Sequence, residues 1–406
     1  KGRVKTLLQN QPVKLVDEIS VEVDALADEP TASIPLLGIK ARIDPEIPLK
    51  NPGLYGAGLW VELTVKKDQG AKKSTIRVDE VEPIAPELDP ERIASMRKAM
   101  TTKEWMAFLL RSIGYNPNVY SSTQQLWLLT RLLPLIEPRV NLIELAPKGT
   151  GKTYVFKSVS RHTLVQTAMM SRANLFGDMA GRNPGIFDQH YDCIVQDEIQ
   201  SARFSDPKEV IGTLKDYLET GSCTVGGKTM TSTTSFVMLG NIPIEHGQPM
   251  HPHLFSAQNC LPEPFMETAF LDRFNGILPG WELPKVRSDA KASGLGLQMG
   301  VIAQLLHVLR KFDCSEILER YVKPELYPEP NIRDVKSVRR LGSAYLKLLF
   351  PHMEVTGEDF VKYCFSPAVQ LRARLYRELE LRDPGEYKGM TRFTIGEPAK
   401  QKAGSV

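Results

Sequence analysis

The sequence lacks the features that mark secreted and membrane proteins. Its five cysteines are scattered and form no CxxC pair, which argues against a disulfide framework or a zinc site and favours a reducing compartment. No signal peptide is recognisable. The longest apolar stretch, at about 126–136, is interrupted by Arg131 and Pro134 and is too short to span a bilayer. These absences predict a cytoplasmic protein without a membrane partner.

Charge of one sign is also lacking, and the sequence contains no internal repeat or low-complexity tract. The net charge is only +3 over 406 residues. This value excludes neither nucleic acid nor protein as a partner, because local patches matter more than the sum. The length predicts two or three domains. Since the chain opens at Lys1 rather than at a methionine, we expect it to begin inside a longer natural protein.

The pattern of apolar residues divides the chain into five segments. Residues 1–85 are rich in short β-branched runs, typical of a small barrel or sandwich, with an OB-like barrel as one option. A linker and helical connector follow, and then strands and helices alternate as in a doubly wound α/β sheet. A helical lid and a polar tail or truncated linker end the chain. In order, the later segments span 86–139, 140–290, 291–385 and 386–406.

A phosphate-binding loop is the strongest signal in the sequence. The apolar run 142–146 leads into a glycine loop and then into Lys-Thr at the start of a predicted helix. Glycines let backbone N–H groups curl around phosphate oxygens, while the lysine reaches the β- and γ-phosphates and the threonine ligates Mg²⁺. Ala146 replaces the first glycine of the strict pattern. The expected nucleotide-binding residues are Pro147, Lys148, Gly149, Thr150, Gly151, Lys152 and Thr153.

Polar residues follow two further predicted strands. Asp197 and Glu198 come directly after the apolar run 193–195, and Asn241 ends the run 235–240. Open α/β sheets bind ligands at the carboxyl ends of their strands. We therefore expect Asp197 to hold the Mg²⁺ shell, Glu198 to activate water as the base, and Asn241 to orient that water. ATP and Mg²⁺ are the cofactors that this set predicts.

The order of these motifs resembles the AAA+ superfamily of P-loop ATPases over about 140–350. Residues 221–231 have the pattern of a β-hairpin with Gly-Gly-Lys at its tip. A hairpin at this position is similar to the pre-sensor hairpin of the clade that contains the MCM helicases and Lon-type ATPases. The segment 270–274 resembles the arginine-finger segment of MCM proteins. This resemblance implies that Arg273 completes the site of a neighbouring subunit and that Arg339 acts as a second sensor.

A closer resemblance is to the BrxL family, the Lon-like ATPases of BREX phage-defence systems. The stretches 105–114, 141–153 and 269–285, with Lys215-Asp216-Tyr217, are similar to that family. The resemblance implies a homo-oligomeric ring, a hexamer or stacked hexamers, that binds or moves along double-stranded DNA and works with other BREX proteins. Members continue into a Lon-protease-like domain, of which no Ser-Lys segment is found here. We therefore expect ATPase activity and no proteolysis.

Several alternatives remain open at this stage. Arg339 also fits a solvated basic helix face, and Lys228 at the hairpin tip fits either a DNA contact or an ordinary turn lysine. The basic loop residues Lys66, Lys67, Lys72 and Lys73 are weaker candidates for DNA contact. Two other functions are possible: a protein unfoldase for a Lon-like protease, with 185–187 as the only candidate pore loop, or a DNA-binding scaffold assembled by ATP.

Overall fold

The computed structural model describes most of the chain and divides it into two compact units, Lys1–Asp89 and Pro90–Val406. The residues described are 8, 11–23, 29–55, 58–68, 75–83, 89–160, 162–167, 169–178, 185–189, 191–250, 253–255, 260–327 and 329–396. Lys72, Lys73 and the last ten positions of the predicted tail lie outside them. In the part described, no helix combines the length and the apolarity needed to cross a bilayer.

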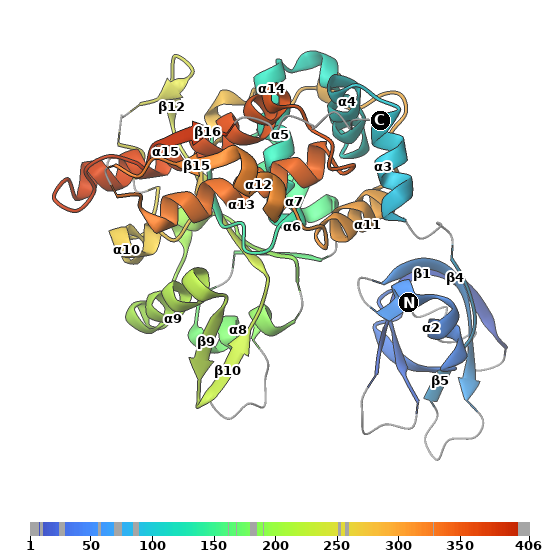
Figure 1. Ribbon diagram of the computed structural model, residues 1–406. Helices are drawn as coiled ribbons and strands as arrows, with labels where there is room; N and C mark the ends of the chain where they lie inside the picture. The colour runs from blue at the N-terminus through green and yellow to red at the C-terminus, as the bar shows by residue number, and fades with distance from the viewer. Residues whose placement is uncertain are drawn as a thin grey trace, which may run out of the picture. The chain divides into compact units, whose positions relative to one another are not determined.

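The first unit is a closed five-stranded barrel (Figure 1). Its strands lie in the order β1-β2-β3-β5-β4, with β3 parallel to β5 and all other neighbours antiparallel. The elements are β1 (Val13–Glu22), β2 (Thr31–Ile34), β3 (Ile39–Ile43), α2 (Glu46–Lys50), β4 (Leu59–Asp68) and β5 (Thr75–Pro83).

Alternation along the strands places one face of the sheet in the interior of the barrel. In β4, Leu59, Val61, Leu63 and Val65 are buried while the intervening side chains are partly or fully exposed, because successive side chains point to opposite faces of a strand. The buried carboxylate of Asp17 accepts hydrogen bonds from the N–H groups of Glu18 and Leu36. The barrel therefore has an apolar core, and the buried Asp17 side chain has its hydrogen bonds satisfied by backbone N–H groups.

The second unit begins with helices that pack on its own core. They are α3 (Pro90–Lys98), α4 (Thr102–Ser112), α5 (Ser122–Thr130) and α6 (Leu133–Ile136). Complete capping boxes begin α4 at Thr101 and α5 at Ser121. The indole N–H of buried Trp105 donates to the carbonyl of Leu348 at 2.8 Å. The predicted helical connector is thus part of the larger unit rather than a free link.

A five-stranded parallel sheet forms the centre of this unit, with the order β14-β6-β11-β8-β7. Every residue of β6, β8 and β14 is buried, as expected for strands covered on both faces. The strands are β6 (Leu142–Ala146), β7 (Thr163–Gln166), β8 (Cys193–Gln196), β11 (Ser235–Asn241) and β14 (Gly276–Pro279). The helices between them are α7 (Lys152–Ser158), α8 (Arg172–Phe176), α9 (Pro207–Thr220) and α10 (Thr268–Leu271).

Two hairpins leave the α/β layers. The first joins β9 (Ser222–Val225) to β10 (Lys228–Thr231) and projects from the body next to α9 (Figure 1). Gly226 and Gly227 form its turn with φ values of 57° and 79°, the left-handed geometry of a two-residue hairpin. The predicted Gly-Gly hairpin is therefore present. The second joins β12 (Ile244–Glu245) to β13 (Gln248–Pro249).

The C-terminal third is helical with one small sheet. Its elements are α11 (Met299–Leu309), α12 (Ser315–Tyr321), β15 (Val322–Pro324), α13 (Ile332–Leu349), α14 (Gly357–Phe360), a π-helical turn (Val361–Phe365), α15 (Ser366–Arg382) and β16 (Phe393–Ile395). Strand β16 pairs with β15, and the N–H of Thr391 donates to Asp334. The expectation of a tail from residue 386 is therefore wrong for these residues, because non-local backbone partners hold them.

Candidate functional site

The ends of three neighbouring strands bring the predicted nucleotide-binding residues together. The phosphate loop follows β6, Asp197 and Glu198 follow β8, and Asn241 ends β11. Strand β11 lies between β6 and β8, with Asn241 opposite Ala146 and Met238 opposite Gln196. The parallel sheet therefore collects side chains that are almost 100 residues apart in sequence at one carboxyl edge.

The loop before α7 has the backbone geometry that a phosphate cradle needs. Gly149 and Gly151 have φ values of 89° and 75°, which an L side chain adopts only with strain. A Cβ on Gly151 would also lie 2.5 Å from the hydroxyl of Tyr115. The hydroxyl of Thr150, a buried residue, donates to the carbonyl of Pro147 at 3.3 Å. Glycine is thus required here by conformation at Gly149 and by both conformation and space at Gly151.

Lys152 and Thr153 each bond to one of the polar strand ends. The ammonium of Lys152 donates to Oδ1 of Asn241 at 2.8 Å. Burial lowers the pKa of Lys152, although the carboxylates of Glu144 and Asp197 oppose that shift. The hydroxyl of Thr153 donates to Oδ2 of Asp197 at 2.8 Å. A bound phosphate would add negative charge next to this buried ammonium and further favour its charged form.

The acidic pair divides into a buried and an exposed carboxylate. Asp197 is buried, and its Oδ1 accepts the backbone N–H of Glu198 at 2.9 Å. Glu198 itself is exposed and has φ 51°. A non-glycine residue in this left-handed region stores strain, and such residues gather at functional sites. The strained turn directs the two successive carboxylates to different surroundings.

The oxygens of Thr153 and Asp197 fit an octahedral Mg²⁺ ion. Neighbouring ligands with metal bonds of 2.0–2.1 Å lie about 2.9 Å apart, and these two oxygens are 2.8 Å apart. Within the described ranges, no group of three or more His, Cys, Asp or Glu residues could hold a metal. A Mg²⁺ ion here would depend on phosphate oxygens and water for its remaining ligands, as is usual for this ion.

A buried ion pair that sequence reasoning missed supports the phosphate loop. The guanidinium of Arg131 donates to both carboxylate oxygens of Glu144, with the shortest bond at 2.6 Å, and also to the carbonyl of Thr150 at 3.1 Å. Both side chains are essentially fully buried. Two signals were available: a lone arginine in the apolar stretch 126–136 and a lone glutamate inside an apolar strand.

Arg273 lies at the opposite edge of the sheet from the phosphate loop of its own chain. It precedes β14, whose first residue Gly276 is opposite Leu142 at the start of β6, and Asn275 bonds to Asn141. The five residues of β6 separate the two edges by about 16 Å. Arg273 therefore does not join Lys152, Asp197 and Glu198 within one subunit.

Arg339 is also distant from the phosphate loop, on α13. Its Nη2 donates to the carbonyl of Val322 at 3.4 Å, and its Nε is buried without a hydrogen-bond partner in the described structure. Together with Arg310 and Lys347 it lines a cavity of about 400 Å³. The neighbouring Arg340 donates to the carbonyl of Arg139, and burial next to Arg139 lowers the pKa of Arg340 to about 10.

Two other sequence candidates lie in contrasting surroundings. Lys228 is exposed as the first residue of β10, next to the turn of the projecting hairpin. In contrast, Phe187 of the candidate pore loop is fully buried, and its ring stacks on Phe176 with a centroid distance of 4.9 Å. It also contacts Tyr217. The side chain of Phe187 is part of the core and is not available as a pore loop.

Relatives with curated descriptions cover nearly the whole chain. It is 32% identical over 386 residues, 93% of its length, to the Lon-like protease BrxL of Escherichia coli O9:H4 (strain HS). It is equally 32% identical over 371 residues, 88% of its length, to the Lon-like protease BrxL of Bacillus cereus (strain H3081.97). These alignments cover 54% and 53% of the relatives. The chain thus spans about half the length of the proteins it matches.

A solved structure and a family model complete the comparison. The crystal structure of a full-length MCM homologue from Methanopyrus kandleri aligns with a TM-score of 0.46 and 14% identity, over 91% of this chain and 77% of that one. The family model described as Lon-like protease BrxL-like, ATPase domain, matches residues 76–392, a range that contains every residue of the site above. The chain therefore belongs to the family of BrxL-like proteins, of which it carries the ATPase domain.

Proposed function

We propose that the chain hydrolyses ATP as an AAA+ protein in a homo-oligomeric ring that encircles or translocates on double-stranded DNA in BREX-type phage defence. The observation that carries the proposal is the convergence of Lys152, Thr153, Asp197, Glu198 and Asn241 at one sheet edge. This set provides a cation for phosphate, oxygens for Mg²⁺, a base and an amide within one site.

Each residue has a defined role in this proposal. The backbone N–H groups of 148–153 surround the β-phosphate, and Lys152 turns from Asn241 to the β- and γ-phosphates. Asn241, released from that bond, orients the attacking water, and Glu198 accepts its proton. Thr153 and Asp197 would hold Mg²⁺, and this ion would neutralise developing charge on the phosphates. The exposure of Glu198 and the burial of Asp197 agree with a base that reaches water and a carboxylate that stays fixed.

The position of Arg273 supports the proposed ring. Because it lies at the amino edge of the sheet, we propose that it completes the site of the adjacent subunit, where it stabilises charge on the γ-phosphate during transfer. We assign Arg339, on the same side of the sheet, a second contact in that composite site. Head-to-tail contacts generate a closed ring where the rotation between subunits closes, and a hexamer or stacked hexamers are proposed here.

Double-stranded DNA is the proposed substrate of the ring. The projecting hairpin presents the exposed Lys228, a point charge suited to sequence-independent phosphate contact. The closed five-stranded barrel, which we propose to be OB-like, is proposed as a second contact with nucleic acid. The buried Phe187 weighs against the unfoldase, because that alternative needs an exposed aromatic pore loop.

The variant Glu198→Gln tests the proposed catalytic site. It keeps the shape of the side chain and removes the base, so we expect ATP binding close to that of the wild type and a kcat lowered by about 100-fold or more. Binding of a fluorescent ATP analogue and phosphate release measure the two effects. A variant that hydrolyses ATP at the wild-type rate would exclude Glu198 as the base.

The proposed DNA partner is tested separately, by the ATPase rate and the oligomer mass with and without duplex DNA. Stimulation of a ring-sized species by the duplex supports the proposal. An ATPase rate that is unchanged by duplex DNA but rises when an unfolded protein is added would instead favour the unfoldase.

A further inference from the structure

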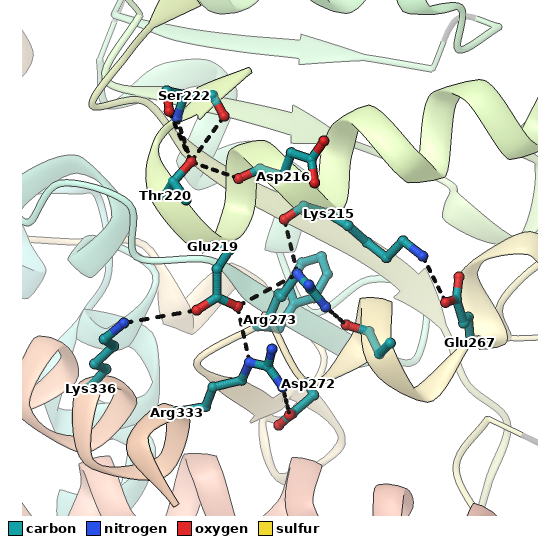
Figure 2. Close-up of polar contacts among 12 residues, drawn as sticks. Lys215, Asp216, Glu219, Thr220, Ser222, Glu267, Asp272, Arg273, Arg333 and Lys336 are labelled. Atoms are coloured by element: carbon teal, nitrogen blue, oxygen red, sulfur yellow. Dashed lines mark hydrogen bonds and ion pairs between the residues drawn. The ribbon is translucent and has the colours of Figure 1, made fainter. Parts of the chain in front are cut away.

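The carboxylate of Glu219, near the end of α9, lies among three cations (Figure 2). Its Oε2 is 3.0 Å from Nε of Arg333 and 3.6 Å from Nε of Arg273, and its Oε1 is 3.9 Å from Nζ of Lys336. Arg333 and Lys336 belong to α13, while Arg273 follows α10. One half-buried carboxylate therefore connects three elements that are far apart in sequence.

The bonds of Arg273 fix one end of its guanidinium and leave the other available. Nε donates to the carbonyl of Lys215 at 2.9 Å and Nη1 donates to the carbonyl of Ala269. Within the described part of the chain, Nη2 makes no hydrogen bond. The preceding residue, Asp272, is bound by Arg333 at 2.9 Å and by the buried Arg372. The side chain is thus oriented before any phosphate arrives, and its Nη2 amino group remains available to donate.

The same end of α9 is fastened to the projecting hairpin (Figure 2). The hydroxyl of Thr220 donates to the carbonyl of Asp216 and accepts the N–H of Ser222, the first residue of β9. Gly221 is the C-cap of α9, and its carbonyl accepts the N–H of Ser232, which follows β10 at the base of the hairpin. A displacement of the hairpin base must therefore move the last turn of α9, on which Glu219 lies.

We propose that Glu219 is a positioning residue, which orients Arg273 for the nucleotide of the adjacent subunit and connects it mechanically to the hairpin. The inference rests on the proposed function of Arg273 and goes beyond it. Glu219 supplies negative charge on the Nε side of the guanidinium, and Nη2 is left to contact the γ-phosphate of the neighbouring site. When DNA shifts the hairpin, Glu219 carries the shift to Arg273 and changes the rate at the neighbouring site.

A double-mutant cycle on the full chain tests this inference. The variants are Glu219→Gln, Arg273→Ala and the two combined. Asp216→Asn is the matched control, because it removes one exposed charge from the same helix without touching Arg273. For each we measure kcat, KM for ATP and the ratio of rates with and without duplex DNA, with circular dichroism and mass as checks of fold and assembly.

We expect Glu219→Gln to lower kcat by about tenfold with KM for ATP unchanged, since ATP binds at residues that Glu219 does not contact. The DNA stimulation ratio should fall towards one. Once Arg273 is alanine, Glu219→Gln should change nothing more, because its effect passes through that side chain. Glu219→Asp, which keeps the charge one methylene further away, should retain more activity than Glu219→Gln, and Asp216→Asn should behave as wild type.

The outcomes separate this inference from the proposed function. If Arg273→Ala lowers kcat while Glu219→Gln leaves it unchanged, the positioning role of Glu219 is wrong, and the role of Arg273 at the neighbouring site is still supported. Equal losses from Glu219→Gln in both backgrounds, or the same loss in Asp216→Asn, also overturn the positioning role. If Arg273→Ala is fully active, both the proposed role of Arg273 at the neighbouring site and this inference about Glu219 are wrong.

Discussion

Among single residues, Arg131 links the stability of the core to the shape of the phosphate loop. Its guanidinium is fully buried and holds both Glu144 and the carbonyl of Thr150. We expect Arg131→Met to lower the free energy of unfolding of the larger unit by about 3–5 kcal/mol, because the carboxylate of Glu144 is left buried without a partner. Urea denaturation followed by tryptophan fluorescence measures this change.

The double variant Arg131→Met with Glu144→Leu is the matched control for that prediction. With both charges removed, no unpaired ion remains, and most of the lost stability should return. Affinity for ATP should stay below that of the wild type, because the bond to the carbonyl of Thr150 is still missing. If the double variant binds ATP as the wild type does, Arg131 has no role in the loop.

At the scale of elements, replacing two nearby glycines with alanine should change the stability of the protein in opposite directions. Gly227 has φ 79° in the hairpin turn, and Gly212 lies inside α9; an added Cβ meets nothing within 4 Å at either position. Conformation alone therefore decides the effect. We expect Gly227→Ala to destabilise by about 1–2 kcal/mol and Gly212→Ala to stabilise by about 0.5–1 kcal/mol.

Thermal unfolding of the two variants measures those shifts, and the ATPase rate with duplex DNA shows whether the hairpin must keep its turn. Gly227→Ala should lower stimulation by DNA and leave the basal rate as it is, while Gly212→Ala should change neither. Equal shifts of both midpoints in the same direction would contradict the assigned turn geometry.

Elements marked by local chemistry were predictable from the sequence, and those held by distant partners were not. The Gly-Gly turn at 226–227 and the glycine loop before Lys152 are determined by glycines that are consecutive or nearly so in the sequence, because glycine adopts the positive φ values that these turns need. The pairing of Phe393–Ile395 with Val322–Pro324 depends on residues about 70 positions apart, and no local pattern indicates it. The predicted tail was wrong for that reason.

The same distinction holds within the site. Lys152, Asp197 and Asn241 each follow an apolar run, and the rule that ligands bind at the carboxyl ends of parallel strands predicts their meeting. The pairs of Arg131 with Glu144 and of Glu219 with Arg333 follow no such rule, because a lone charge in a sequence does not name its partner. Only the packed structure identifies the residues that support and position the site.

For the whole molecule, the positions of Arg273 and Glu198 at opposite sheet edges imply that each proposed ATP site needs two subunits. This leads to a prediction that would not hold if each ATP site were built from a single chain: two inactive variants should complement each other. Glu198→Gln subunits lack the base but keep Arg273, while Arg273→Ala subunits lack the finger but keep Glu198. Alone, each protein should be nearly inactive. In a mixed ring, a site formed by Glu198 of one and Arg273 of the other is complete.

Random mixing of equal amounts should make about one site in four complete, so the mixture should reach about a quarter of the wild-type rate. The measurement is phosphate release after the two variants are co-assembled, with mass analysis to verify that rings of wild-type size form. A control mixture of Glu198→Gln with Lys152→Ala should stay inactive, since one subunit lacks the base and the other lacks the phosphate-binding lysine, so no site in the mixed ring has both. Activity no higher than that of the separate variants would mean that Arg273 does not act across the subunit boundary.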